Sequence, residues 1–428
     1  MDSIFAQATA TGRAGVSVIR LSGAQAFDIA RIFCNLPQVG RTGLRAVRGR
    51  DGALIDQALV LCFEQGASFT GERVVEFQVH GGLATVAKLL SELSEQEGCR
   101  LAEPGEFTRR ALENGQLDLN QVEALSDLID AETESQRQQA IRVLDGRFGD
   151  AGEMWRGKLL RAAALLEASI DFSDEEIPDD LSVEVISLVE ETRASIAAIL
   201  ERSMMASKIR TGFTVAIIGA PNVGKSTLLN AIVGRQAAIT SDVAGTTRDV
   251  IECRVDLQGL AVSFLDTAGL RESEDEIENL GISKAYEMAA AADIRVFLVE
   301  EVGEPLPIAL RDGDIVRLNK GDERSSDVGT VSGKTGEGVS ELLSLIAERL
   351  MVKTPQDVVA IRERQITGLR AAESFLGRVL ELTHADPLPF ELASQELYFA
   401  LSELDFVFGR IDIESVLDEI FSSFCLGK

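Results

Sequence analysis

The segment from Gly219 to Ser226 reads Gly-Ala-Pro-Asn-Val-Gly-Lys-Ser and matches the phosphate-loop pattern G-x-x-x-x-G-K-[ST]. An apolar segment, FTVAIIG, leads into it and a helical segment, TLLNAIVG, follows, which is the context that the pattern requires. Glycines let backbone N–H groups curl around a phosphate, and the helix N-terminus adds a favourable dipole. We expect Lys225 to reach the terminal phosphate oxygens and Ser226 to bind Mg²⁺. A glycine-rich turn without a ligand is the weaker alternative.

Three later segments have the residue types that a purine nucleotide needs. Asp266 follows the apolar segment AVSFL and begins the run Asp-Thr-Ala-Gly, which places a carboxylate beside the metal. Asp322 lies in the run Asn-Lys-Gly-Asp after DIVRL, and its carboxylate can accept two hydrogen bonds from guanine that adenine does not offer. The loop 332–334 is expected to contact the base. Together these segments resemble the motifs of GTPases, so the predicted nucleotide is GTP.

The segment SDVAGTTRDV resembles a GTPase switch motif, in which Thr247 provides the second hydroxyl ligand of Mg²⁺ beside Ser226. The residues predicted to bind GTP are Asn222, Val223, Gly224, Lys225, Ser226, Thr227, Ser241, Asp242, Val243, Ala244, Gly245, Thr246, Thr247, Asp266, Thr267, Ala268, Gly269, Asn319, Lys320, Asp322, Ser332, Gly333 and Lys334.

Leu270 occupies the position where a Ras-type hydrolase has the glutamine that orients the attacking water. Leucine has no polar atom for that role. Either hydrolysis is negligible, or another group has taken over the orientation of the water.

The elements that must position these residues fall into four segments. Residues 1–118 mix short apolar alternations with helical stretches, which is typical of an α+β domain. Residues 119–210 are helix-forming almost throughout, residues 211–352 alternate strands and helices as in a parallel α/β sheet, and residues 353–428 return to helices. The simplest arrangement is a multidomain protein in which a Ras-like α/β domain is inserted into an all-helical domain, so that the two helical parts pack together.

Composition narrows the function class. The formal charge of −27 opposes unaided nucleic-acid binding, although residues 1–118 are nearly neutral, with 12 Lys/Arg against 14 Asp/Glu. Five scattered cysteines without a CxxC pair indicate thiols in a reducing compartment rather than disulfides or a zinc site. The start of the chain lacks the pattern of a signal peptide, and no apolar run approaches a membrane-spanning length. We therefore expect a cytoplasmic protein without a membrane partner.

Segments along the whole chain resemble the tRNA-modification GTPase family known as MnmE or TrmE. They are GRAGVSVIRLSG, SFTGERVVEFQVHGG, PGEFTRRALENGQLDLNQVEALSDLIDA, IDFSDEEIP, the GTPase core and the terminal FSSFCLGK. The resemblance implies a K⁺-stimulated GTPase that drives addition of a carboxymethylaminomethyl-type group to C5 of the wobble uridine of certain tRNAs. It also implies a homodimer formed through the N-terminal domain, and a heterotetramer with an FAD-containing partner of the MnmG or GidA type. The partner would supply most of the basic tRNA surface, which fits the acidic charge of this chain.

A ribosome-assembly GTPase switch without folate chemistry is the competing hypothesis, because the GTPase motifs alone fit both functions. Assembly factors usually have a basic RNA-binding module, and none is visible in the sequence. A scaffold with a vestigial core is disfavoured by the intact set of Lys225, Ser226, Thr247 and Asp266.

The resemblance also implies a K⁺ site made by Asn222, Ser241, Val243 and Thr246, whose cation would supply the positive charge that an arginine finger gives elsewhere. Ser241 stands where threonine is common and keeps the hydroxyl. Glu278 matches the glutamate that orients the hydrolytic water in the family, which resolves the question raised by Leu270.

In the N-terminal domain the family binds a reduced folate, 5-formyl- or methylene-tetrahydrofolate, and Arg20 and Glu76 match its ligands. A carboxylate can hold the amidine-like edge of a pterin with two hydrogen bonds, and arginine suits the glutamate tail. Without the resemblance, a surface salt bridge would be the default interpretation. Gln116 stands where the family usually has lysine, and Lys428 matches a residue that the family brings to the folate site.

The terminal Cys-x-Gly-Lys tail contains Cys425, which the resemblance implicates in the modification chemistry. That role needs an accessible thiolate, which the neighbouring Lys428 would favour. A structural cysteine packed under Phe424 is the alternative.

Overall fold

The computed structural model describes residues 2–171, 179–236, 251–266, 287–319, 329–352, 362–385, 389–410, 420–421, 424 and 427. The chain divides into two compact units, each with its own interior. The first comprises Met1–Ser126, Gly149–Glu153 and Ser402–Lys428, and the second comprises Asp127–Phe148 and Met154–Leu401. No described helix is both long enough and apolar enough to cross a membrane.

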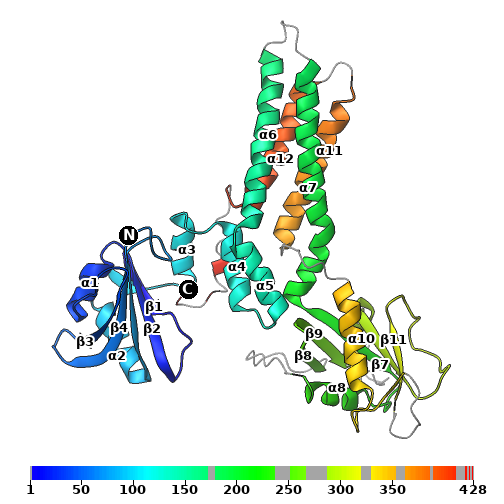
Figure 1. The fold of residues 1–428 in the computed structure, drawn as a ribbon, viewed down its shortest axis with the longest axis horizontal. Coiled ribbons are helices and arrows are strands. Elements are labelled where there is room, and N and C mark those ends of the chain that lie inside the picture. Colours follow the sequence, from blue (N-terminus) through cyan, green and yellow to red (C-terminus); the bar gives the residue numbers. More distant parts are fainter. Residues whose placement is uncertain are drawn as a thin grey trace, which may run out of the picture. The chain divides into compact units, whose positions relative to one another are not determined.

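The first unit is built on a mostly antiparallel sheet, of which Figure 1 labels β1, β2, β3 and β4. Its strand order is β3-β4-β5-β2-β1-β6, and among its described pairs β1 with β6 is the parallel one. Its elements are β1 (Ser3–Gln7), β2 (Ala14–Ser22), α1 (Ala26–Phe33), β3 (Thr42–Arg48), β4 (Leu54–Phe63), β5 (Val74–Gly81), α2 (Leu83–Ser94), β6 (Cys99–Leu101) and α3 (Glu106–Glu113), with α4 (Leu119–Ile129) after them.

One face of this sheet is packed and the other is largely open. Helices α1 and α2 bury their apolar stripes against every second residue of the strands, such as Val60 on β4 and Phe77 on β5. On the opposite face the β1 end is covered, where Ile4 and Ala6 pack against Phe107 of α3. Antiparallel sheets tolerate such an open face because their strands alternate apolar and polar residues. The open face is therefore available to polar chemistry.

The second unit combines a helical bundle with a second sheet. Its elements are α5 (Glu134–Leu144), α6 (Arg147–Asp171), α7 (Asp179–Thr211), β7 (Phe213–Gly219), α8 (Lys225–Val233), β8 (Ile251–Leu257), β9 (Leu260–Asp266), β10 (Ile294–Val299), β11 (Ile315–Asn319), β12 (Thr330–Val331), α10 (Val339–Val352), α11 (Glu363–Leu382) and α12 (Phe390–Val407).

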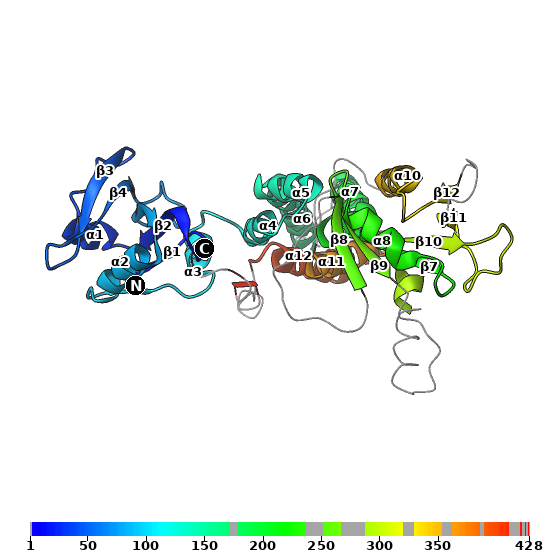
Figure 2. The same cartoon turned by 90° about the horizontal axis from the view of Figure 1, so that it is seen from below.

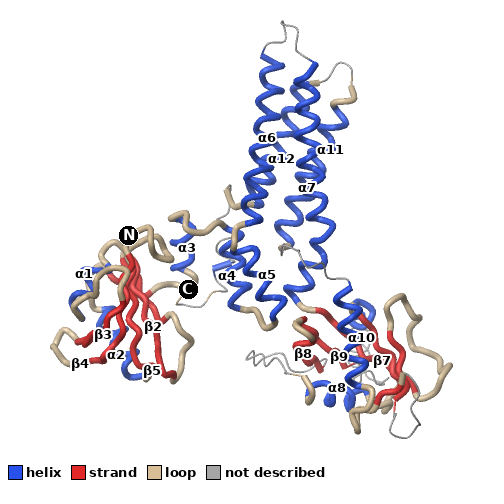
Figure 3. Tube along the Cα trace, in the orientation of Figure 1, coloured by secondary structure: helices blue, strands red, loops and turns tan. Residues whose placement is uncertain are grey.

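Helices α6, α7, α11 and α12 lie side by side in the bundle, as the blue tubes of Figure 3 show. Trp155 of α6 is fully buried, and its indole N–H donates to Ser195 Oγ of α7 at 3.0 Å. Ion pairs connect neighbouring helices around the outside: Lys158–Glu191, Arg193–Glu373 and Arg378–Glu396, together with a hydrogen bond from Tyr398 to Glu167. Helices from both ends of the second unit thus form one bundle, which confirms the prediction that the α/β segment is inserted into a helical domain.

The second sheet has the strand order β12-β11-β10-β7-β9-β8, and all its pairs are parallel except β8 with β9. Helices α8 and α10 pack on one face, over a core that includes Val215, Leu228 and Ile346 (Figure 2). Because parallel strands point the same way, the carboxyl ends of β7, β9, β11 and β12 meet at one edge. The chain adds strands first on one side of β7 and then on the other, and ligands bind at such a switch point in open α/β sheets.

Candidate functional site

The phosphate loop lies at this edge, between β7 and α8. Asn222 has φ 63° and Gly224 has φ 100°, so both adopt the left-handed conformation that curls the loop. Asparagine tolerates this conformation better than most residues, and glycine does so at no cost. Helix α8 begins after Gly224 with no side chain capping its first N–H groups. Uncapped N–H groups at a helix N-terminus form a ready anion site, so this loop fits a phosphate.

Lys225 places its ammonium group inside the loop. The side chain is only 5% exposed, and Nζ donates to the carbonyl oxygens of Gly219 at 2.9 Å and Ala220 at 2.8 Å. Burial lowers the pKa of the Lys225 ammonium, and the nearby Asp266 carboxylate opposes that shift. Among the described residues, the hydrogen bonds of this buried cation go to neutral carbonyls, so it gains strongly when an anion such as a triphosphate arrives.

Ser226 and Asp266 meet across the sheet edge. Ser226 Oγ donates to Asp266 Oδ2 at 2.6 Å, joining the start of α8 to the end of β9. A hydroxyl and a carboxylate are hard oxygen ligands of the kind that Mg²⁺ takes when phosphates complete its shell. The structure therefore brings together two of the groups that the sequence assigned to the metal region.

Asn319 ties the base segment to the phosphate loop. The side chain is 6% exposed, and its Nδ2 donates to the carbonyl oxygen of Val223. A Cβ added at Gly224 would lie 2.5 Å from that same Nδ2, so the loop needs glycine there for space as well as for φ. The sequence placed Asn319 only in the base motif, whereas its contact makes it a positioning residue for the loop.

The loop after β12 packs directly on the phosphate-loop helix. Ser332 is 1% exposed and holds a tight turn, in which its Oγ accepts from the N–H of Thr335 at 3.2 Å. A Cβ added at Gly333 would lie 2.6 Å from the backbone nitrogen of Leu228. Backbone atoms cannot move aside, so glycine is required for the close approach of this loop to α8. The predicted base and phosphate segments are thus adjacent.

Two further predicted residues are described: Thr227 follows Ser226 on α8, and Lys334 follows Gly333 in the loop after β12. The other predicted residues of the nucleotide site and of the tail lie outside the described residues, so the structure assigns them no position. They are Ser241, Asp242, Val243, Ala244, Gly245, Thr246, Thr247, Thr267, Ala268, Gly269, Glu278, Lys320, Asp322, Cys425 and Lys428.

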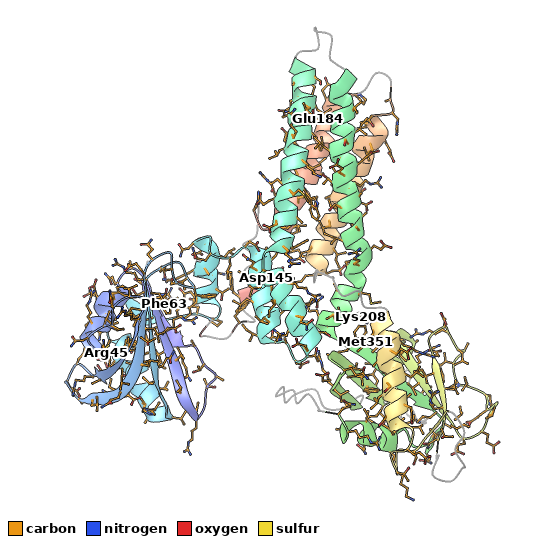
Figure 4. All side chains as sticks on the ribbon, viewed as in Figure 1. Arg45, Phe63, Asp145, Glu184, Lys208 and Met351 are labelled. Atoms are coloured by element: carbon orange, nitrogen blue, oxygen red, sulfur yellow. The ribbon has the colours of Figure 1, made fainter. Side chains whose placement is uncertain are left out.

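A second candidate site lies on the open face of the first sheet. Arg20 on β2 stands directly opposite Glu76 on β5, and Arg20 Nε lies 2.9 Å from Glu76 Oε1. The pair borders a cavity of about 160 Å³ whose walls include Phe63, labelled in Figure 4, and Phe69. The Arg20 guanidinium carbon lies 5.5 Å from the ring centre of Phe69 and 5.6 Å from that of Phe107. A flat polar ligand could therefore meet a carboxylate, a guanidinium and aromatic rings in one place.

Gln116 is not among the residues that line this cavity. Its exposed side chain lies against Gly71, where an added Cβ would come within 3.1 Å of Gln116 Cγ. The stretch around Gly71 also contributes Ser68 and Phe69 to the cavity wall, so Gln116 supports that wall from outside.

A polar network that could not be predicted from the sequence holds this wall. Glu72 accepts from Ser22 Oγ at 2.7 Å and from Arg110 Nη1 at 3.0 Å, and Ser22 also pairs with Thr70 at 2.7 Å. Arg110 is 5% exposed, and a buried charge of this kind needs such partners. These residues are up to 88 positions apart in the sequence, so no local pattern connects them.

The C-terminal segment returns to the same unit. Phe421 and Phe424 are buried beside Val122. Gly427 approaches the backbone of Gln7 and Ala8 so closely that an added Cβ would clash with both. Gln7 follows Ala6, which pairs with Arg20 across the sheet, so described residues of the tail lie near the strand that carries Arg20.

Two family models match the chain. One, described as the N-terminus of GTP-binding protein TrmE, matches residues 3–116, and the other, described as the MnmE helical domain, matches residues 119–425. The tRNA modification GTPase MnmE of Roseobacter denitrificans is 52% identical over 429 residues, covering 100% of both chains. The proteins of the same name from Ruegeria pomeroyi and from another Ruegeria species are 51% and 50% identical over 430 residues, again covering 100% of both chains.

Proposed function

Because the chain belongs to the MnmE family of tRNA modification GTPases, and is therefore a GTP hydrolase, we propose that it couples GTP hydrolysis to folate-dependent modification of tRNA. The product is a carboxymethylaminomethyl-type group on C5 of the wobble uridine of certain tRNAs, made together with an FAD-containing partner. The observation that carries the proposal is the presence in one chain of a phosphate loop positioned by Asn319 and a separate cavity bordered by Arg20 and Glu76.

In the nucleotide site, the uncapped start of α8 and the buried Lys225 would hold the triphosphate. Ser226 with Thr247 would hold Mg²⁺, and Asp266 would orient the Ser226 hydroxyl through the 2.6 Å hydrogen bond that joins them. Magnesium would supply charge neutralisation for the phosphates. Glu278 would orient the hydrolytic water in place of a glutamine, and the segments around Asn319 and Ser332 would bind guanine.

Asn222 supports a potassium site next to the phosphates. The residue is exposed, curls the loop with its positive φ, and its side chain has no hydrogen-bond partner among the described residues. A free amide oxygen on such a loop suits a hard monovalent cation. Ser241, Val243 and Thr246 would complete the shell, and the ion would add positive charge where the transition state needs it.

Exchange of Na⁺ for K⁺ is expected to raise GTP turnover, and Asn222→Ala is expected to remove the difference between the two salts. The physical reason is the loss of one cation ligand. Alanine also adopts the left-handed φ of this position less readily than asparagine, and the rate in Na⁺ reports that effect on the loop separately. Turnover is measured by phosphate release at constant ionic strength. Asn230→Ala, on the exposed side of α8, is the matched control and should keep the K⁺ response. Equal rates of the unaltered protein in both salts would contradict the potassium assignment.

The cavity beside Arg20 and Glu76 would hold the tetrahydrofolate one-carbon donor. Glu76 offers a carboxylate to the amidine-like edge of the pterin, and Phe69 offers a ring to its flat face. Arg20 would face the acidic tail of the folate. The resemblance to the family gives Gln116 and Lys428 a part in folate binding too, and Gln116 would act through the stretch around Gly71 that it contacts. The reduced folate, 5-formyl- or methylene-tetrahydrofolate, would supply a one-carbon unit near the tail that contains Cys425.

A homodimer is supported by exposed apolar residues on the open face of the first sheet. Leu44 on β3 and Leu59 on β4 are directly opposite each other and are 63% and 37% exposed. Neighbouring apolar side chains on an uncovered face favour association with a second copy. The FAD-containing partner would then join two such chains in a heterotetramer and bind most of the tRNA.

Nucleoside analysis of tRNA from cells lacking this protein tests the proposed function. The wobble modification should be missing and should return when the unaltered gene is restored. Intact modification in the deleted strain, together with a defect in ribosomal subunits, would replace the proposal by the ribosome-assembly function.

A further inference from the structure

In one stretch of this acidic chain, between Asp28 and Asp51, every charged residue is an arginine. Between Asp28 and Asp51 the sequence has no Asp, Glu or Lys, although the chain as a whole carries a formal charge of −27. The charged residues of the stretch are Arg31, Arg41, Arg45, Arg48 and Arg50. Such a local excess of positive charge is the footprint of a surface for anions.

The stretch forms an edge of the first sheet. Strand β3 is the outermost strand, paired only with β4, and Arg45 lies on it at the margin of the unit in Figure 4. Arg41 directly precedes the strand and Arg48 ends it. Seven residues of extended chain span roughly 23 Å. That length covers about six or seven phosphates of one duplex strand, at about 3.4 Å each.

Three of the five arginines keep their charge uncompensated. Arg31 pairs with Asp28 at 2.6 Å and Arg50 pairs with Glu92 at 3.5 Å. By contrast, Arg41, Arg45 and Arg48 form no ion pair within the part of the chain that the structure describes. The guanidinium groups of Arg45 and Arg48 donate to backbone carbonyls instead, from Arg45 to Asn35 at 2.7 Å and from Arg48 to Gly52 at 3.0 Å. A carbonyl fixes a guanidinium in place without neutralising it.

Arg45 is held in a prepared orientation. Besides Asn35, it donates to the carbonyl of Leu44 at 2.9 Å. Its guanidinium lies over Gly43, where an added Cβ would come 2.7 Å from Nη1. Glycine at this strand position therefore leaves room for the group to lie along the edge. Arg45 alternates with Leu44 along the strand, so it is on the opposite face from the proposed dimer surface and stays free when two copies associate.

We propose that Arg41, Arg45 and Arg48, here called the arginine edge, bind the phosphodiester backbone of tRNA. The inference rests on the proposed function, which makes tRNA the substrate. Arginine suits phosphate because its planar fork can donate two parallel hydrogen bonds, and the stretch uses arginine alone. Charged residues also protect edge strands from pairing with other strands, but residues of either sign do that. The charged residues of this edge are all positive, although the chain as a whole is negative. Such an edge suits contacts with the phosphates of tRNA, and these contacts would orient the substrate.

The test measures binding of a fluorescein-labelled, unmodified tRNA transcript to the full-length protein by anisotropy. Three phosphate contacts correspond to a slope of about −2.7 for log affinity against log salt, or about 40-fold in affinity between about 50 and 200 mM salt. The triple variant Arg41→Gln, Arg45→Gln and Arg48→Gln should lose this part of the salt dependence. A control with the same change in net charge, Arg137→Gln, Arg161→Gln and Arg193→Gln, should keep it, because those arginines already pair with carboxylates.

Gly43→Val tests the geometry without a change in charge. Valine is a good strand residue, yet its side chain would displace the Arg45 guanidinium, so tRNA affinity should fall to a value between those of the unaltered protein and the triple variant. GTP turnover and the thermal unfolding midpoint should remain unchanged in all three variants, which shows that each is folded.

Three results would overturn the inference: no saturable tRNA binding by the unaltered protein at about 50 mM salt, equal salt slopes in the two triple variants, or stronger competition by poly-glutamate than by unlabelled RNA. The last result would identify an acidic peptide as the occupant. None of these outcomes depends on the modification chemistry, so loss of the wobble modification in the deleted strain would still support the proposed function.

Discussion

Replacement of Lys225 with alanine is expected to lower GTP turnover by about a hundredfold or more. The Lys225 ammonium is buried inside the phosphate loop and donates to the carbonyls of Gly219 and Ala220. Alanine would leave those two carbonyls unpaired and remove the one buried cation of the described loop. Removal of a single preorganised donor from a water-excluded site typically costs about 10²- to 10³-fold in rate. Phosphate release at saturating GTP measures the effect on turnover, and a fluorescent guanine nucleotide measures the effect on affinity.

Lys158→Ala is the matched control for Lys225→Ala. Lys158 lies in the helical bundle, where Nζ forms a 2.7 Å ion pair with Glu191 on the surface. Surface pairs of this kind contribute about 1 kcal/mol or less to stability, so turnover should stay at the level of the unaltered protein. A Lys225→Ala protein that turned over GTP within about threefold of the unaltered rate would show that the loop does not hold the triphosphate in the expected way.

The phosphate site could be predicted from sequence because its signals are local. The loop pattern, the strand before it and the helix after it are contiguous, and the motifs at Asp266 and Asn319 each end a strand. Parallel strands then bring their carboxyl ends to one edge by geometry alone. The GTP hydrolase activity predicted from these motifs, and the family predicted from segments along the whole chain, are confirmed by the full-length relatives.

The contacts between those motifs could not be predicted. Asn319 reaches Val223 because β11 and β7 lie on either side of β10 in the sheet. The order of strands in a sheet cannot be predicted from any single segment of the sequence. The approach of Gly333 to Leu228 likewise depends on how α8 packs against the loop after β12. Both contacts are consequences of tertiary structure. They show that Asn319, predicted to bind the base, and Gly333, predicted to lie in a loop, also hold the phosphate loop and its helix in place.

The N-terminal site shows the same limit more strongly. Arg20 and Glu76 are 56 positions apart, and only the pairing of β2 with β5 brings them opposite each other. Family resemblance pointed to these two residues, but it did not point to Phe107, which supplies the second ring beside Arg20. It also placed Gln116 among the ligands; in the structure the Gln116 side chain lies against Gly71 and is not among the residues that line the cavity, and its role in folate binding stays a prediction.

Glu76→Gln is expected to weaken the binding of 5-formyltetrahydrofolate about 10- to 150-fold. The change keeps the shape of the side chain and removes the charge that would accept hydrogen bonds from the pterin edge. Hydrogen bonds to charged groups contribute about 1.5 to 3 kcal/mol, which corresponds to that range of affinity. Titration calorimetry with the full-length protein measures the dissociation constant directly, and it does so without GTP or the flavoprotein partner.

The neighbouring pair of Glu64 and Arg73 provides the control. Glu64 Oε1 accepts from Arg73 Nε at 2.6 Å, but both side chains are 45% exposed and neither lines the cavity. Glu64→Gln should therefore leave the dissociation constant for the folate unchanged. Arg20→Ala should weaken binding too, and it should also lower the thermal midpoint, because it leaves Glu76 partly buried without its ion pair.

The double variant separates a ligand role from a structural one. If both side chains contact the same bound folate, the effects of Arg20→Ala and Glu76→Gln on affinity should add only in part, because each change disturbs the partner of the other. If the pair only holds β2 against β5, the thermal midpoint should fall in every variant while the dissociation constant stays within about twofold of the unaltered value. That second outcome would remove the folate from this cavity, even in a protein that still hydrolyses GTP at the normal rate.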